Sequence, residues 1–137
     1  MKICGTVIRP LERSIISLRL AESIVMSYSS ISTPLPRSNA NARALNLIVE
    51  GRSWLDHLAV DPATRSTTSV CLTVEGADAD FIKKFAGLLE AEHAAYDIAS
   101  YRDAPPGLRI WCGATVDTAD IEALGPWLDW AWASLKN

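Results

Sequence analysis

Two arginines, Arg102 and Arg109, lie seven positions apart in the segment YRDAPPGLRIWCG (101–113). Arg109 interrupts the short apolar run GLRIW, where a buried charge is costly unless it is paired. A guanidinium offers a planar fork of donors that binds a carboxylate at two points. Arg109 is therefore a candidate carboxylate-binding residue, and an exposed or internally paired arginine is the structural alternative.

Arg102 has a different setting, because it follows Tyr101 in the loop that leads to two consecutive prolines. A loop arginine beside a phenol suits the binding of a phosphate group. The simpler alternative is an arginine that is solvated or paired with its neighbour Asp103. Tyr101 and Arg102 are therefore candidate phosphate-contacting residues.

The residues around Arg109 predict which way it faces. Side chains alternate between the two faces of a strand, so Leu108 and Ile110 share one face with Cys112. Arg109 and Trp111 share the other. We expect the first face to pack against helices and the second to meet solvent, another domain or a ligand.

Hydrophobic periodicity and turn residues predict the elements that position this strand. Helices are expected over 38–51, 78–92 and 116–137, and strands over 54–60, 68–74, 94–101 and 107–113. Ser38 and Asp117 are expected N-caps, and Gly51 is expected to end the first helix. Pro126 predicts a kink or break near Gly125.

The resulting order, α-β-β-α-β-β-α, predicts an α+β fold with a small antiparallel or mixed sheet covered on one face by helices. Residues 1–37 lack a steady periodicity and hold the Ser/Pro-rich stretch SYSSISTPLPR. They are expected to form a separate, partly helical or loop segment that precedes a domain over 38–137.

Composition narrows the function. The 137 residues are 49% hydrophobic, enough for one domain with a core, and the net charge of −3 argues against an electrostatic nucleic-acid binder. No apolar run is long enough to span a membrane. The three cysteines and two histidines have no metal-ligand spacing, and buried free thiols in a reducing cytoplasm are the expectation.

Several motifs resemble those of one family. DPATRS…TSVCL, YRDAPPGLRIW and PWLDWA, in this order and spacing, look like the C-terminal small domain of the phosphoserine aminotransferase family, in the form found in many alphaproteobacteria. The resemblance is strong over 38–137 and weaker at LAESI. It implies the fold of the small domain of fold-type I aminotransferases, which use pyridoxal phosphate and act in serine biosynthesis in the cytoplasm.

The resemblance also implies roles for the two arginines. In this family an arginine at the position of Arg109 binds the substrate carboxylate, and the loop that holds Tyr101 and Arg102 contacts the substrate phosphate. The implied partners are a phosphorylated amino acid or a 2-oxo acid. The implied reaction is amino transfer between phosphoserine or 3-phosphohydroxypyruvate and glutamate or 2-oxoglutarate.

One departure from the family is large, because Lys2, Lys83, Lys84 and Lys136 all lack the context of its cofactor lysine. We therefore expect a fragment without the large domain, with 1–37 as an unmatched or rearranged start. Such a chain is expected to bind no pyridoxal phosphate and to be inactive alone, so whether it is an enzyme stays open. The alternative is a non-catalytic remnant that dimerises or binds a partner through the surface that faces the large domain.

Overall fold

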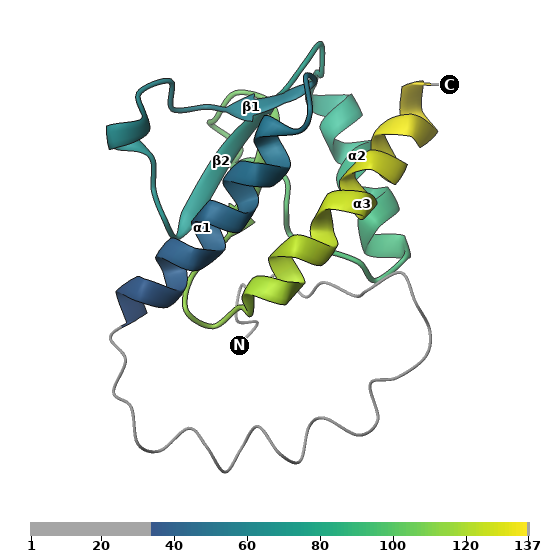
Figure 1. Ribbon diagram of the computed structural model, residues 1–137. Helices are drawn as coiled ribbons and strands as arrows, with labels where there is room; N and C mark the ends of the chain where they lie inside the picture. Colours follow the sequence, from purple (N-terminus) through teal and green to yellow (C-terminus); the bar gives the residue numbers. More distant parts are fainter. Residues whose placement is uncertain (1–33, 137) are drawn as a thin grey trace, which may run out of the picture.

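The computed structural model describes residues 34–136 of the chain. Within them, three helices lie against one three-stranded sheet (Figure 1). The elements in chain order are α1 (Pro34–Glu50), β1 (Leu55–His57), the short 3-10 helix η1 (Pro62–Thr64), β2 (Ser69–Val74), α2 (Ala79–Ala91), β3 (Gly107–Trp111) and α3 (Thr118–Lys136).

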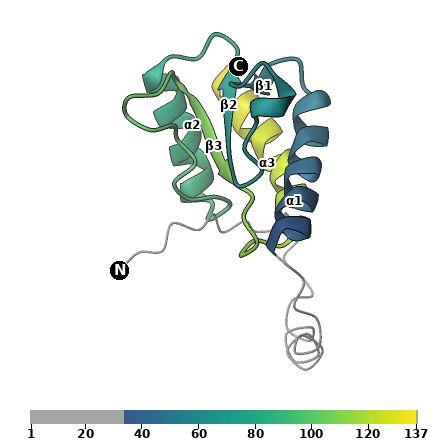
Figure 2. The same cartoon turned by 90° about the vertical axis from the view of Figure 1, so that its left-hand side faces the viewer.

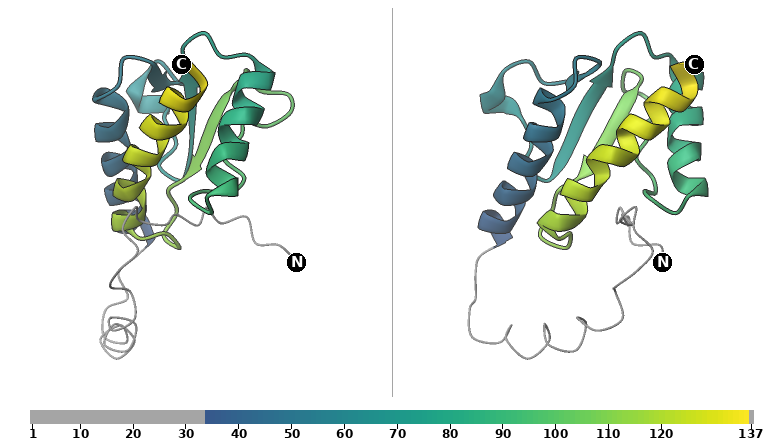
Figure 3. Two further views of the ribbon diagram at one scale, coloured as in Figure 1. Left: turned by 90° about the vertical axis from the view of Figure 1, so that its right-hand side faces the viewer. Right: turned by 45° about the vertical axis from the view of Figure 1, so that its right-hand side comes forward.

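The sheet is antiparallel with the strand order β1-β2-β3. Figure 2 shows the sheet with α2 and α1 at its two sides and α3 behind it, visible between β2 and α1. In the opposite view α3 lies in front, between α1 and α2 (Figure 3). The expected α+β architecture, with helices on one face of a small antiparallel sheet, is confirmed.

The alternation of burial along the strands explains this arrangement. In β2, the side chains of Val70, Leu72 and Val74 are buried, and the residues between them are half-buried. In β3, Leu108 and Ile110 are buried too. The inward side chains meet the apolar faces of the helices in one core, whose fully buried members include Leu45, Phe85, Leu89, Ile121, Leu124 and Leu128.

Helix α2 follows the sequence prediction closely. Asp78 caps its N-terminus, because the carboxylate accepts a hydrogen bond from the backbone N–H of Phe81 at 2.7 Å. Phe85 is fully buried, whereas Lys83 and Lys84 are exposed. The helix thus presents its apolar stripe to the sheet and its charges to solvent.

Helix α1 begins four residues earlier than the sequence predicted. Ser38, the expected N-cap, is buried inside the helix, which starts at Pro34. Prolines are tolerated in a first helical turn because the N–H groups there have no partner within the helix. Most of the segment 1–37, which was expected to be partly helical or loop, lies outside the described residues.

The strand expected over 94–101 is wrong, and the element order is α-β-β-α-β-α. His93 and Asp97 have φ angles of 56° and 54°, which bend the chain out of the extended conformation. One isolated bridge, Ala99 to Leu108, remains. It is flanked by backbone hydrogen bonds from Ser100 N to Gly107 O at 3.0 Å and from Arg109 N to Ile98 O at 2.7 Å, so this segment runs along β3.

The break expected in the last helix is also absent, since α3 continues through Pro126. Pro126 has no N–H to donate to the carbonyl of Glu122, one turn earlier. Both residues are exposed, so water can bind that carbonyl. The rings of Trp127 and Trp130, three residues apart on this helix, contact each other with centroids 5.7 Å apart.

A buried amide ties α1 to the loop between β3 and α3. Asn41 is fully buried, and its Nδ2 donates to the carbonyls of Cys112, Gly113 and Val116 at 2.8 to 3.2 Å. Its Oδ1 accepts from the hydroxyl of Thr118 at 2.7 Å. One side chain thereby donates to three loop carbonyls, of which that of Gly113 also accepts from the N–H of Val116 at 3.1 Å.

A second link joins the other end of α1 to α3. Arg52 donates to both carboxylate oxygens of Asp129, each at 2.6 Å, and also to the carbonyl of Ile48 at 2.7 Å. The two-point geometry fixes the distance between the helices as well as pairing the charges. Close packing at Gly125 assists, because an added Cβ there would lie 3.1 Å from the Arg52 guanidinium.

His57 links β1 to α1. Asn46 Nδ2 donates to Glu50 at 2.5 Å, which leaves Asn46 Oδ1 to accept from His57 Nε2 at 3.0 Å. Burial lowers the pKa of His57, and the positive charge of Arg65 lowers it further, against the opposing effect of Asp56 and Glu50. The imidazole is therefore neutral at pH 7 and carries its proton on Nε2.

The described helices include none that is both long and apolar enough to cross a bilayer.

Replacing Asn41 with alanine is expected to lower the free energy of unfolding by about 2–4 kcal/mol, because the carbonyls of Cys112 and Val116 and the hydroxyl of Thr118 lose their buried partner. Urea unfolding followed by circular dichroism measures this change. Arg43→Ala, at an exposed position of the same helix, is the control and is expected to change stability by less than about 0.5 kcal/mol. Equal effects of the two substitutions would contradict the assigned role of Asn41.

Candidate carboxylate-binding site

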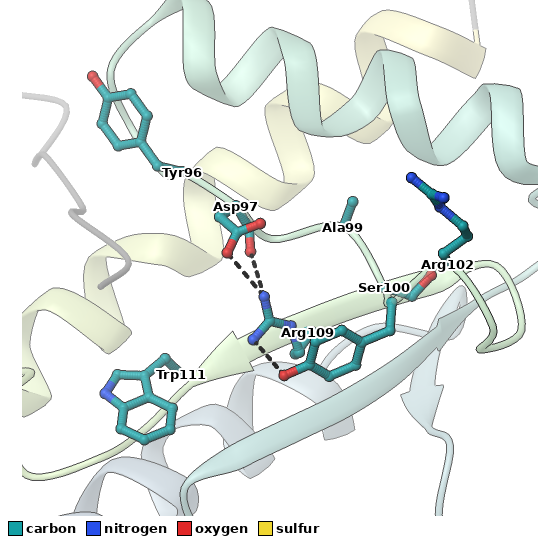
Figure 4. Close-up of a pocket in the computed structure, with 8 residues that line it drawn as sticks. Tyr96, Asp97, Ala99, Ser100, Arg102, Arg109 and Trp111 are labelled. Atoms are coloured by element: carbon teal, nitrogen blue, oxygen red, sulfur yellow. Dashed lines mark hydrogen bonds and ion pairs between the residues drawn. The ribbon is translucent and has the colours of Figure 1, made fainter. Parts of the chain in front are cut away.

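A hollow of about 570 Å³ lies beside the outer face of β3 (Figure 4). Its floor is formed by Arg109 and Trp111 of β3, and its wall by the segment that runs along this strand. The wall residues are Tyr96, Asp97, Ala99, Ser100, Tyr101 and Arg102. The hollow therefore gathers all three predicted site residues, Tyr101, Arg102 and Arg109.

Arg109 faces this hollow, as the alternation in β3 predicted. Its side chain is only 12% exposed, and its guanidinium is paired within the chain. Nη2 donates to Asp97 Oδ2 at 2.9 Å and to the Asp97 carbonyl at 3.5 Å. The arginine is thus both part of the floor of the hollow and a member of an internal ion pair.

Tyr101 completes the surroundings of this guanidinium. Its hydroxyl accepts a hydrogen bond from Arg109 Nη1 at 3.0 Å, and the Arg109 Cζ lies 4.2 Å from the centre of its ring. A cation over an aromatic face is held by electrostatic attraction in addition to the hydrogen bond. Tyr101 thereby orients Arg109, and its expected role as a phosphate-contacting residue stays a prediction.

Arg102 shares the hollow but points elsewhere. It is exposed, and Figure 4 shows its guanidinium turned away from that of Arg109. It also lines a second hollow, between the 99–106 loop and α2, together with Lys83. Within 34–136 its guanidinium makes no hydrogen bond or ion pair, so of the simpler alternatives for Arg102 the pairing with Asp103 is not seen there, and the cation is exposed to solvent.

Trp111 is held flat against the loop that follows β3. Its Nε1 donates to the hydroxyl of Thr115 at 3.0 Å. A Cβ added to Gly113 would lie 2.4 Å from the indole ring, so only glycine leaves room for it. The loop sequence therefore fixes the indole beside Arg109.

Asp97 is the site residue that the sequence reasoning missed. It was assigned to a strand, and its positive φ and its contact with Arg109 did not follow from that assignment. A signal was present, because Asp97 is the acid within an apolar stretch just as Arg109 is the base within another. Opposite charges in two adjacent apolar segments indicate a pair.

The two described cysteines differ in exposure, and neither forms a disulfide. Cys112 is buried, and burial raises the pKa of its thiol to about 12, so this thiol is protonated and unreactive. Cys71 is half-buried on the outer face of the sheet, directly opposite Arg109 in the strand register. No cluster of metal-binding side chains occurs in residues 34–136.

The chain is an α+β domain with an arginine-lined hollow, and its fold is found in solved structures. The phosphoserine aminotransferase of Bacillus circulans subsp. alkalophilus superposes with a TM-score of 0.59 at 20% identity, over 72% of this chain and 26% of that one. A structure that records radiation damage of the Schiff base in phosphoserine aminotransferase gives 0.59 at 13% identity, over 72% and 27%. These likenesses show the fold.

Sequence comparison gives the relationship. The chain is 40% identical to the phosphoserine aminotransferase of Methanosarcina mazei over 120 residues, and 41% identical to that of Methanosarcina barkeri over the same length. It is homologous to a part of phosphoserine aminotransferase. The match covers 88% of this chain, which spans 31% of the length of these curated relatives. No family model matches the chain.

The length of the match bears on the N-terminal segment. A match over 120 residues is longer than the stretch from 38 to 137, so the sequence similarity begins upstream of Ser38. The division of the chain at residue 37 stays a prediction.

Gly113→Ala is expected to destabilise the fold by about 1–3 kcal/mol, because the new methyl group would overlap the indole of Trp111. Urea unfolding measures the change. In a Trp111→Ala background the same substitution is expected to cost much less, because the ring is gone. An equal cost in both backgrounds would place the strain elsewhere.

Proposed function

We propose that this chain is the small domain of a phosphoserine aminotransferase and that Arg109 binds the carboxylate of the substrate. The observation that carries the proposal is the position of Arg109. It lies on the helix-free face of the sheet, 12% exposed, at the floor of a hollow about 570 Å³ in volume. The homology to phosphoserine aminotransferases supports it.

The substrates of phosphoserine transamination explain why a half-buried arginine, Arg109, and an exposed one, Arg102, suit this hollow. Phosphoserine, 3-phosphohydroxypyruvate, glutamate and 2-oxoglutarate all carry a carboxylate next to the reacting carbon. A rigid, oriented guanidinium such as that of Arg109 can fix this shared group at two points. Only the first two also carry a phosphate, and the exposed guanidinium of Arg102 is available for it.

The cofactor of such a reaction is pyridoxal phosphate, which would supply an electron sink for the reacting carbon and would need a lysine to anchor it in the resting enzyme. The residues described here do not fit it. Lys83, Lys84 and Lys136 are all exposed, and none lines the Arg109 hollow. Lys136 instead lies over the Trp132 ring, with Nζ 4.7 Å from its centre. We infer that the remainder of the enzyme has to supply the cofactor site.

The contribution of this chain is then binding and orientation. Arg109 is stacked on Tyr101 and anchored in β3, so it holds a carboxylate without first having to be ordered. Its side chain is only 12% exposed, and electrostatic attraction to a largely buried charge is stronger than in bulk water. The indole of Trp111 forms the apolar part of the same floor.

Binding of O-phospho-L-serine and L-glutamate to the full chain tests the roles of the arginines. Arg109→Lys is expected to weaken both ligands about tenfold or more, because a lysine cannot donate at two points. Arg102→Ala is expected to weaken phosphoserine alone. Chemical-shift titration by NMR measures both effects.

Arg43→Lys, on the exposed side of α1, is the matched control for changes of a surface arginine. It is expected to leave both affinities unchanged. The proposal fails when Arg109→Lys and Arg43→Lys give the same affinities.

The purified chain is expected to show no transamination with added pyridoxal phosphate, because its described lysines are all exposed and outside the hollow. A coupled assay with phosphoserine and 2-oxoglutarate measures this, with the Methanosarcina mazei enzyme as the positive control. Turnover by the chain that is lost on substitution of one of its lysines would contradict the expectation.

A further inference from the structure

We propose that Asp97 occupies the place at Arg109 that a ligand carboxylate takes, so that ligand binding exchanges one carboxylate for another. The inference rests on the proposed role of Arg109 as a carboxylate-binding residue. It adds that the carboxylate of Asp97 competes with the ligand for the Arg109 guanidinium. Asp97 lies in the wall of the same hollow, and its carboxylate reaches the guanidinium from the hollow's side (Figure 4).

The hydrogen bonds show why an exchange is required. The Nη2 group has two hydrogens, and it donates to Asp97 Oδ2 at 2.9 Å and to the Asp97 carbonyl at 3.5 Å. Nη1 donates to the Tyr101 hydroxyl at 3.0 Å. A two-point complex with an incoming carboxylate needs parallel N–H donors, so the ligand has to take at least one of those that Asp97 accepts.

The difference in exposure shows which partner moves. The side chain of Asp97 is 60% exposed, whereas that of Arg109 is 12% exposed. Asp97 can therefore turn its carboxylate into water at little cost, because an exposed carboxylate stays solvated. Arg109 stays in place, since it is stacked on the Tyr101 ring and its backbone is bonded to the carbonyl of Ile98 at 2.7 Å.

The backbone of Asp97 keeps the competitor in position. Its φ of 54° lies in the left-handed region, which aspartate and asparagine tolerate better than most residues. Non-glycine residues in such conformations gather at functional sites and switch regions. This turn presents both the carbonyl and the carboxylate of one residue to Nη2, so that the resting guanidinium is neutralised.

The exchange has a consequence for selectivity. A ligand with one weak acceptor cannot compete with two oxygen atoms of Asp97, whereas a carboxylate that also reaches Nη1 can. The internal pair therefore sets a threshold that favours ligands able to bind the guanidinium at two points.

Removal of the competing charge tests the proposal in the full chain. Asp97→Asn keeps the size and tolerates the positive φ, and it is expected to tighten L-glutamate binding about two- to fivefold, the range of an exposed ion pair. Asp103→Asn is the matched control, because Asp103 is an exposed acid of the adjacent loop with no bond to Arg109. NMR titration of each variant at the same ionic strength gives the affinities.

Asp97→Gly provides a second variant, because glycine adopts the positive φ without strain and has no carboxylate. Circular dichroism and thermal unfolding confirm that each variant is folded before it is titrated. Tighter binding in both Asp97 variants, beyond any change in Asp103→Asn, supports the exchange. Unchanged or weaker binding in both Asp97 variants overturns it and makes Asp97 a positioning residue for Arg109.

Arg109→Gln separates failure of this inference from failure of the proposed function. If Arg109→Gln leaves glutamate affinity unchanged, Arg109 is not the carboxylate-binding residue and the proposed function itself fails. If Arg109→Gln abolishes binding while the Asp97 variants do not tighten it, the proposed function stands and only the exchange is wrong.

Discussion

The pairing of β2 with β3 is the constraint on which the rest of this structure depends. Cys71 lies opposite Arg109, so Leu108 and Ile110 point into the core and Arg109 points away from it. A slip of one residue would reverse every side chain of β3 and bury the guanidinium. Gly107 opposes such a slip, because a side chain there would meet the carbonyl of Leu72, 2.1 Å from the position of a Cβ.

The loops around this strand are as well defined as the strand itself. Asn41 satisfies the carbonyls of the loop that follows β3, and Gly113 in that loop leaves room for the indole of Trp111. On the other side, Asp97 and Tyr101 engage the guanidinium of Arg109. The site is therefore organised by side chains from both sides of one short strand.

The sequence predicted the elements and side-chain orientations that depend on local periodicity. It did not predict the residues whose conformation or role depends on contacts with distant parts of the chain. The alternation in GLRIW was enough to place Arg109 and Trp111 on the outer face, and the periodicity over 78–92 was enough to predict α2. The turn at Asp97 was missed because an aspartate with positive φ is stabilised by a partner twelve residues away. Asn41 was overlooked because its amide is useful only beside a loop far along the chain. The predicted roles of Arg102 and Tyr101 stay predictions, although both lie at the hollow.

The two links between α1 and α3 bear on how the domain folds. Asn41 bonds to Thr118 and Arg52 to Asp129, each pair 77 residues apart in the chain. Contacts so far apart in sequence close large loops, and proteins rich in them fold slowly. On the ribosome, α1 and the sheet must wait for the last helix to emerge before the core can close. Until then α3 does not cover the apolar side of β2 and β3. The exposed apolar surface makes the nascent domain prone to misassembly.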